Sequence, residues 1–167
     1  APFQQALERI DTIPGIGQRT AEQIVAEIGV DLKSRFPSAG HLCSWIGLIP
    51  GQNESAGKRR QSKLRKGNKY LRQALTEAAQ SVARSDHYLG AQFRRIAARR
   101  GGQRAAVAVA HSMMTIVYHL VIKEEVYQEL GADYYDRRQE EAIVRRTVKK
   151  LKELGYEVTI AKPISAS

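Results

Sequence analysis

The sequence has a single cysteine and no long uninterrupted apolar run, and we expect no secretory leader. One cysteine, Cys43, cannot form an intramolecular disulfide and fits a reducing compartment. The first residues lack the basic stretch followed by an apolar one that a signal peptide requires. The longest mostly apolar run, residues 105–122, is interrupted by His111, Ser112 and His119. This interruption favours a buried amphipathic helix over a membrane span.

Acidic residues are scarce relative to basic ones. The chain carries 27 Lys and Arg against 17 Asp and Glu, a formal charge of +10. Its 43% apolar and 26% charged residues are typical of a folded protein, and 167 residues suffice for one domain with an appendage. The excess of positive charge favours an anionic partner, most simply nucleic acid. We therefore expect a cytoplasmic, nucleoid-associated protein with no membrane partner.

Apolar residues recur at helical spacing along most of the chain. Ser38 is expected to cap one short helix, and Gly47 to end it. Residues 156–160 alternate weakly, as a short terminal strand would. The predicted class is all-α, with a helical domain over residues 1–130 and a charged helical extension over 131–167. Helices are predicted near residues 3–10, 20–28, 39–46, 70–82, 93–100, 105–127 and 137–154.

A glycine-rich turn joins the first two predicted helices. In Pro14-Gly15-Ile16-Gly17 the glycines permit backbone conformations that are closed to residues with a Cβ atom. Free N–H groups at the turn and at the next helix N-terminus then suit phosphate oxygens. Ile16 is expected to point inward, and the small Ala21 to let the two helices approach.

This pattern, over residues 3–29, resembles the helix-hairpin-helix motif, which contacts a nucleic-acid backbone without reading its sequence. The alternative is a turn between helices that binds no ligand. Valine in place of either glycine is expected to weaken DNA binding without unfolding the core. The predicted contacts are Gly15, Ile16, Gly17, Arg19 and Thr20.

Residues 58–72 contain eight basic side chains and no acidic one. Such a run can be a solvated surface, but it lacks the alternating acids that stabilise an exposed helix face, so a nucleic-acid contact is favoured. Most of it falls in a predicted loop, residues 48–67. The predicted contacts are Lys58, Arg59, Arg60, Lys63, Arg65, Lys66, Lys69 and Arg72. A second basic patch comprises Arg94, Arg95, Arg99, Arg100 and Arg104.

Ser55 lies just upstream of the basic run. A serine in a polar loop is ordinarily inert, and no His–Asp pair is spaced to activate it. Two of the four histidines, His111 and His119, lie on an apolar helix and are expected to be core residues. The basic residues that follow Ser55 can stabilise both an alkoxide and a pentavalent phosphorane, which makes it a candidate nucleophile.

Several stretches, in this order, resemble the C-terminal domain of the IS116/IS110/IS902-type insertion-sequence transposases. The resemblance runs from about residue 3 to residue 127. Its motifs are Ile13-Pro-Gly-Ile-Gly17 with Ala21, Ala26-Glu-Ile-Gly29, Arg35-Phe-Pro-Ser-Ala39, Trp45-Ile-Gly-Leu-Ile-Pro50, Glu54-Ser-Ala-Gly-Lys58 and Lys66-Gly-Asn-Lys-Tyr-Leu-Arg72.

The resemblance implies an enzyme that cuts and rejoins DNA strands. Family members join an RNase-H-like domain, with an Asp-Glu-Asp-Asp metal site, to this helical domain. A serine of the helical domain is implied as the nucleophile, and it falls on Ser55; Ser62 fits that role less well. A structured bridge RNA and several copies of the protein are further implied partners.

The chain departs from the family pattern at two points. Ala56 stands where many members have a second glycine, and no acidic tetrad occurs on strand-like segments. Asp133 and Asp136 flank a helix start, where capping explains them. We therefore expect no metal or other cofactor in this chain, with Mg²⁺ expected in a missing N-terminal domain, and no recombination by this fragment alone.

Two other interpretations remain open. The first is a non-enzymatic helix-hairpin-helix module that binds nucleic acid and in which Ser55 is inert. The second is a tyrosine recombinase using Tyr70 or Tyr118, which lacks the accompanying His and Arg constellation. The apolar stripe of residues 137–154 is the candidate surface for self-association.

Overall fold

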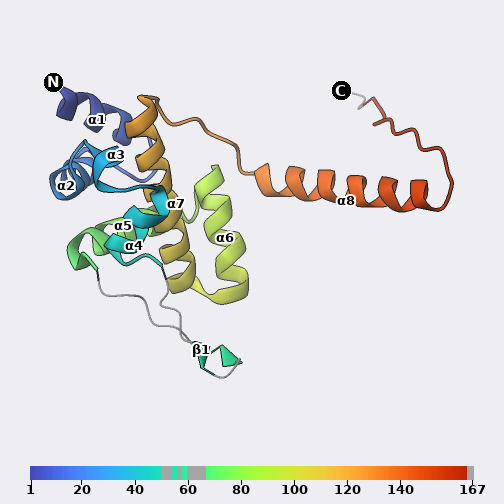
Figure 1. Ribbon diagram of the computed structural model, residues 1–167, viewed down its shortest axis with the longest axis horizontal. Coiled ribbons are helices and arrows are strands. Elements are labelled where there is room, and N and C mark those ends of the chain that lie inside the picture. The colour runs from blue at the N-terminus through green and yellow to red at the C-terminus, as the bar shows by residue number, and fades with distance from the viewer. Residues whose placement is uncertain (50–53, 56–57, 60–66, 165–167) are drawn as a thin grey trace. The chain divides into compact units, whose positions relative to one another are not determined.

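The computed structural model describes residues 1–49 and 67–164, together with the backbone of residues 54–55 and 58–59 (Figure 1). Nearly all regular structure in these ranges is helical, so the predicted all-α class is confirmed. The elements in chain order are α1 (Pro2–Asp11), α2 (Gln18–Ile28), α3 (Leu32–Arg35), α4 (Ala39–Ile46), β1 (Glu54–Ser55), β2 (Lys58–Arg59), α5 (Lys69–Ser81), α6 (Tyr88–Arg100), α7 (Gly102–Lys123) and α8 (Tyr134–Glu153).

Capping residues that can be recognised in the sequence set the two ends of α4. The Ser38 hydroxyl accepts a hydrogen bond from the His41 N–H at 3.3 Å, so it caps α4 as predicted. Gly47 then ends α4 in the left-handed region, with φ of 89°. The long helix α7 stops at Lys123, short of the predicted residue 127, because Glu124 adopts a left-handed conformation.

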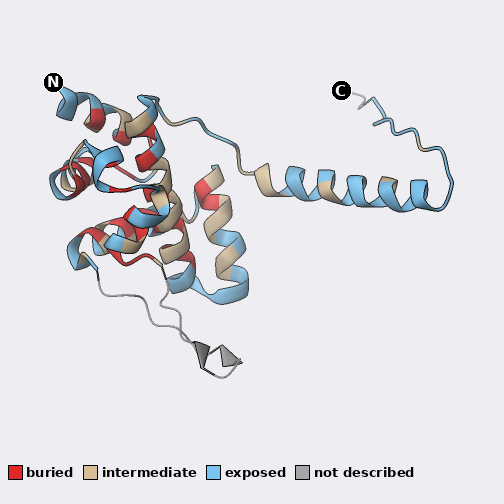
Figure 2. Cartoon of the chain, viewed as in Figure 1, coloured by how far each residue is buried: buried red, intermediate tan, exposed pale blue. Residues whose placement is uncertain are grey.

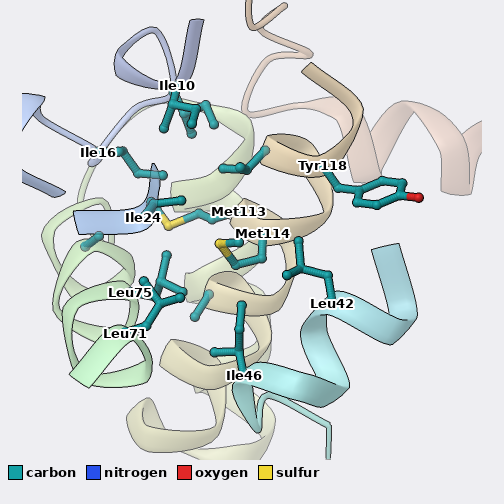
Figure 3. Close-up of a cluster of buried hydrophobic side chains, with 14 of the residues drawn as sticks. Ile10, Ile16, Ile24, Leu42, Ile46, Leu71, Leu75, Met113, Met114 and Tyr118 are labelled. Atoms are coloured by element: carbon teal, nitrogen blue, oxygen red, sulfur yellow. The ribbon is translucent and has the colours of Figure 1, made fainter. Parts of the chain in front are cut away.

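The chain divides into two compact units, Ala1–Ala132 and Asp133–Ser167. In the first unit α7 is the central helix, and it packs against α6, α5, α4 and α1. Its side chains Met113 and Met114 lie in the middle of the core, among aliphatic residues from the surrounding helices (Figure 3). Burial on this scale is the main source of stability for the unit.

By length and composition alone, α7 could cross a membrane. Half of its most apolar window is buried inside the protein, and the burial follows the sides that face the neighbouring helices (Figure 2). A central core helix has this composition for packing reasons. The apolar run is therefore a buried helix, as predicted. His119 is exposed, so the prediction that it is a core residue is wrong.

The second unit is built on α8, which has no buried residue. Ion pairs join Asp133 to Arg137 at 3.1 Å and Lys162 to Glu140 at 2.9 Å. The predicted terminal strand at residues 156–160 is wrong, since residues 155–164 form neither helix nor strand. No strand lies beside this segment in the described ranges, so its weak alternation has no ladder of hydrogen bonds to support it.

Candidate nucleic-acid interface

The turn between α1 and α2 is fixed from the inside by two isoleucines. Ile13 and Ile16 are 1% and 3% exposed, and Ile16 points into the core cluster (Figure 3). The Ile16 N–H donates to the Ile13 carbonyl at 3.1 Å. Ala21 is fully buried, and α1 and α2 pack on each other. The inward position of Ile16 is therefore as predicted, and the burial of Ala21 agrees with its expected role, while the Ile16 N–H is already paired.

The two glycines of this turn have different surroundings. Gly15 has φ of +85°, and a Cβ atom there would lie 2.6 Å from Val82 Cγ1 and 2.8 Å from the Ala78 carbonyl. Gly17 is the N-cap of α2 with φ of −89°, and a Cβ atom would meet nothing within 4 Å. A valine side chain at Gly17 would have free space, so the prediction that this variant keeps its core intact agrees with the structure. At Gly15 the same prediction is wrong, because Ala78 of α5 and the adjacent Val82 occupy the space that the side chain would need.

The N-terminus of α2 is open to an anion. The first N–H of α2 with a helical partner is that of Ala21, which donates to the Gly17 carbonyl at 2.9 Å. Within the described residues, the N–H groups of Gln18, Arg19 and Thr20 have no acceptor, as expected for the first turn of a helix. The first turn holds no acidic residue, and Arg19 is exposed while Thr20 is half-buried.

Helix α5 runs antiparallel to α2, and the glycine turn between α1 and α2 packs against the C-terminal end of α5. The Gln23 amide of α2 donates to the Tyr70 carbonyl near the start of α5, whereas Gly15 contacts Val82 just beyond its end. The 12 or so residues between these contacts span about 18 Å of helix. The glycine turn and the start of α5 are thus two separate points on one rigid support.

The predicted serine-bearing loop leaves and rejoins the core at one place. Leu48 is buried, and a Cβ atom on Gly67 would collide with the Ile46 carbonyl at the end of α4. Asn68 caps α5 by accepting from the Leu71 N–H at 3.0 Å. The Asn68 amide also donates to Glu27 of α2 at 2.8 Å. This exit and re-entry point, Leu48 and Gly67–Asn68, is called the loop base below.

Four residues of the predicted loop are in fact strand. Glu54–Ser55, which is labelled β1 in Figure 1, pairs antiparallel with Lys58–Arg59. Ser55 and Lys58 are partners in this register. The lack of apolar periodicity hid this pairing, because two-residue strands leave no pattern. Among the other predicted contacts, Lys69 is exposed and Arg72 half-buried on α5. Arg60, Ser62, Lys63, Arg65 and Lys66 lie outside the described residues.

Among the other nucleophilic side chains of the first unit, Tyr118 and Cys43 are buried and hydrogen-bonded, whereas Tyr70 is exposed. The Tyr118 hydroxyl donates to the Phe36 carbonyl at 2.8 Å, and the residue is 7% exposed. Its side chain is therefore structural, which removes it as a recombinase tyrosine. Burial raises the pKa of the Cys43 thiol, which donates to the His111 carbonyl, and burial lowers the pKa of His111 itself. Tyr70 is exposed on α5.

The described residues do not offer a donor set for a divalent metal. No three His, Cys, Asp or Glu side chains gather there. Asp133 stands at the N-cap position of α8, where its carboxylate pairs with Arg137 and makes no cap hydrogen bond.

Residues 7–94 match the model of a protein family, the Transposase IS116/IS110/IS902 family. This match includes the glycine turn, the loop base and about half of α6. The chain belongs to the IS116/IS110/IS902 transposase family. The predicted resemblance is confirmed at the family level.

Named relatives extend beyond the family match. The transposase for insertion sequence element IS1111A of Coxiella burnetii (strain RSA 493 / Nine Mile phase I) is 31% identical over 133 residues, which are 77% of this chain and 36% of that protein. The pilin gene-inverting proteins of Moraxella bovis and Moraxella lacunata are each 32% identical over 114 residues, 66% of this chain and 35% of theirs. The chain thus spans about a third of the length of these relatives.

Proposed function

We propose that this chain is the DNA-binding, serine-bearing domain of a transposase that cleaves and rejoins DNA strands. The observation that carries the proposal is membership of the transposase family together with an open, acid-free helix N-terminus at the glycine turn. Transposition of an element and inversion of a gene, the processes named for the relatives, both require cutting and joining of DNA.

The glycine turn is proposed to hold the phosphate backbone. The unpaired N–H groups at the start of α2 and the positive end of its dipole favour an anion, and Arg19 adds a charge beside them. Because these contacts go to phosphate and not to bases, they orient a duplex without reading sequence. We propose that α1, the glycine turn and α2 together act as a helix-hairpin-helix motif.

Ser55 is proposed as the nucleophile. Its hydroxyl oxygen forms a bond to a DNA phosphorus while one P–O bond of the backbone breaks, and the serine proton is passed on to the departing oxygen. The product is a phosphoserine ester and a free DNA end, and the reverse reaction rejoins a strand. The backbone register makes a basic residue, Lys58, the pairing partner of Ser55, and this supports the proposal.

Further partners are proposed for the whole protein. A structured bridge RNA would pair with donor and target DNA, and Mg²⁺ would act in an RNase-H-like domain outside these residues. Self-association is proposed through the exposed stripe Ile143, Val144 and Leu151 of α8. Light scattering of the chain at high concentration tests that surface, and a strict monomer would remove it.

The chemistry is tested by trapping a covalent intermediate. A longer protein with its upstream residues restored is incubated with its RNA and with a DNA substrate whose cleaved end cannot rejoin. Mass spectrometry then identifies any nucleotide bound to the peptide that contains Ser55. We expect an adduct that Ser55→Ala abolishes and that the matched variant Ser62→Ala retains.

The competing function is a non-enzymatic module that binds nucleic acid and carries an inert Ser55. Strand cleavage without an adduct would favour that module, since the cutting would then use a water molecule activated elsewhere. An adduct on Ser62 in place of Ser55 would keep the serine chemistry and move the nucleophile.

A further inference from the structure

The helical pair α6 and α7 is free of acidic residues. From His87 to Lys123 the sequence contains no Asp or Glu, whereas it contains five arginines. Mixed charges are usual on exposed helices because they stabilise each other at short range. An unbalanced stretch of this length points to an external anion.

Four of these five arginines fall into two groups, Arg94 alone and Arg99, Arg100 and Arg104 together. The Arg94 guanidinium donates to the carbonyls of Ala83 and Ser85 at 3.1 and 2.7 Å, so it caps the chain beyond α5. Arg99 and Arg100 lie in the last turn of α6, and Arg104 lies in the first turn of α7. All three are exposed. We call Arg99, Arg100 and Arg104 the arginine tip; the turn Gly101–Gly102 connects them.

The turn that connects these arginines is uncrowded. A Cβ atom on Gly101 or on Gly102 would meet no atom within 4 Å. The N-terminus of α7 carries partial positive charge, its first turn has no acidic residue, and Arg104 adds a full charge there. A cation in this position is unfavourable for the helix, because it faces the positive end of the dipole. A bound anion would reverse that penalty.

The arginine tip lies at the same end of the first unit as the loop base. Tyr118 of α7 bonds the Phe36 carbonyl before α4, and the His111 carbonyl of α7 accepts from Cys43 within α4. Contacts thus move toward the N-terminus of α7 as the chain advances along α4. The end of α4, against which Gly67 packs, therefore faces the start of α7 (Figure 1).

We propose that the arginine tip is a second phosphate-binding site, which holds a nucleic-acid strand beside the loop base. The proposal rests on the proposed function, because it adds a contact to the same nucleic acid. The glycine turn offers mainly backbone N–H groups, whereas the arginine tip offers guanidinium groups that bind phosphate oxygens in pairs. A strand held at both sites is fixed at two points of the first unit.

The test compares two variants that lose the same charge. In the first, Arg99, Arg100 and Arg104 are all replaced by Gln, which preserves length and helix propensity. In the matched control, the exposed Arg145, Arg146 and Lys150 of α8 are replaced by Gln. Circular dichroism and thermal melting check that both are folded. Affinity for fluorescent duplex DNA, single-stranded DNA and structured RNA is measured by anisotropy from 50 mM to 400 mM salt, in steps of about twofold.

We expect the tip variant to bind the preferred nucleic acid about tenfold or more weakly, and the slope of log K against log salt to fall in magnitude by about 2 to 3. The α8 control should keep the slope. Equal losses in the two variants, or an unchanged slope in the tip variant, would overturn the arginine tip while leaving the proposed function intact. An unmodified chain that binds none of the three probes would overturn both.

Discussion

Two glycine turns of the first unit look alike in sequence and differ in what surrounds them. One joins α1 to α2 through Gly15 and Gly17, and the other joins α6 to α7 through Gly101 and Gly102. In each pair the first glycine has a positive φ, +85° at Gly15 and +87° at Gly101. The second glycine of each pair has open space beside it.

The difference lies behind the first glycine. A Cβ atom on Gly15 would collide with Val82 and with the Ala78 carbonyl, whereas a Cβ atom on Gly101 would have no atom within 4 Å. Gly15 is therefore required by packing as well as by backbone conformation, and Gly101 by conformation alone. A glycine in a phosphate-binding pattern can thus serve the fold, the ligand or both, and only its neighbours tell which.

The largest effect is expected from Gly15→Val. A β-branched residue at φ of +85° is strained, and its Cβ atom meets the backbone oxygen of Ala78, which cannot move aside cheaply. We expect the free energy of unfolding to fall by about 3 kcal/mol or more, measured by urea denaturation. A melting temperature within about 2 °C of the unmodified chain would contradict the packing assigned to this turn.

A smaller loss is expected from Gly101→Ala. The Gly101 backbone, with φ of 87° and ψ of 162°, lies in a region that residues with a Cβ atom essentially never occupy. With no neighbour to clash, the loss is strain alone, about 1–3 kcal/mol of the free energy of unfolding. Gly15→Ala is the matched comparison. A greater loss at Gly101 than at Gly15 would reverse the difference between the two turns.

The sequence predicted what depends on short-range pattern. Ser38 and Gly47 bound α4, and Ile16 fills the core, because capping and apolar spacing act within a few residues. It did not predict α3, a single turn held by the buried Leu32, nor the pairing of Ser55 with Lys58. Elements this short carry no periodicity.

The candidate site was less predictable than the fold. The motif favours equal roles for Gly15 and Gly17, yet α5 comes from more than fifty residues later and its position beside Gly15 is a tertiary contact. The sequence predicts one basic patch from the five arginines of α6 and α7. In the structure Arg94 instead donates hydrogen bonds to the carbonyls of Ala83 and Ser85 in the preceding segment. Distinguishing structural from available charges requires the fold.

Gly17→Val should affect binding more than folding. The site is open and its φ of −89° suits any residue, so we expect the free energy of unfolding to change by less than about 1 kcal/mol. The branched side chain would block close approach of a phosphate to the first N–H groups of α2. Loss of one such charge-assisted hydrogen bond predicts about a tenfold loss of affinity for duplex DNA in an anisotropy titration.

Arg19→Gln provides the control for that variant. It removes a charge beside the same turn and leaves the backbone accessible, so the salt slope should fall by about 1 while close approach remains possible. Unchanged affinity of a folded Gly17→Val protein would mean that no phosphate contacts this turn.

The smallest effect is expected from Gly102→Ala. Gly102 is the first residue of α7, and a methyl group there meets nothing, so alanine should raise the free energy of unfolding by about 0.5 kcal/mol through better helix propensity and a less flexible unfolded chain. Affinity for nucleic acid should stay the same, because the arginine tip is proposed to bind through side chains. A folded Gly102→Ala protein that binds markedly more weakly would show that a phosphate reaches the α7 backbone, and the two glycine turns would then bind in the same way.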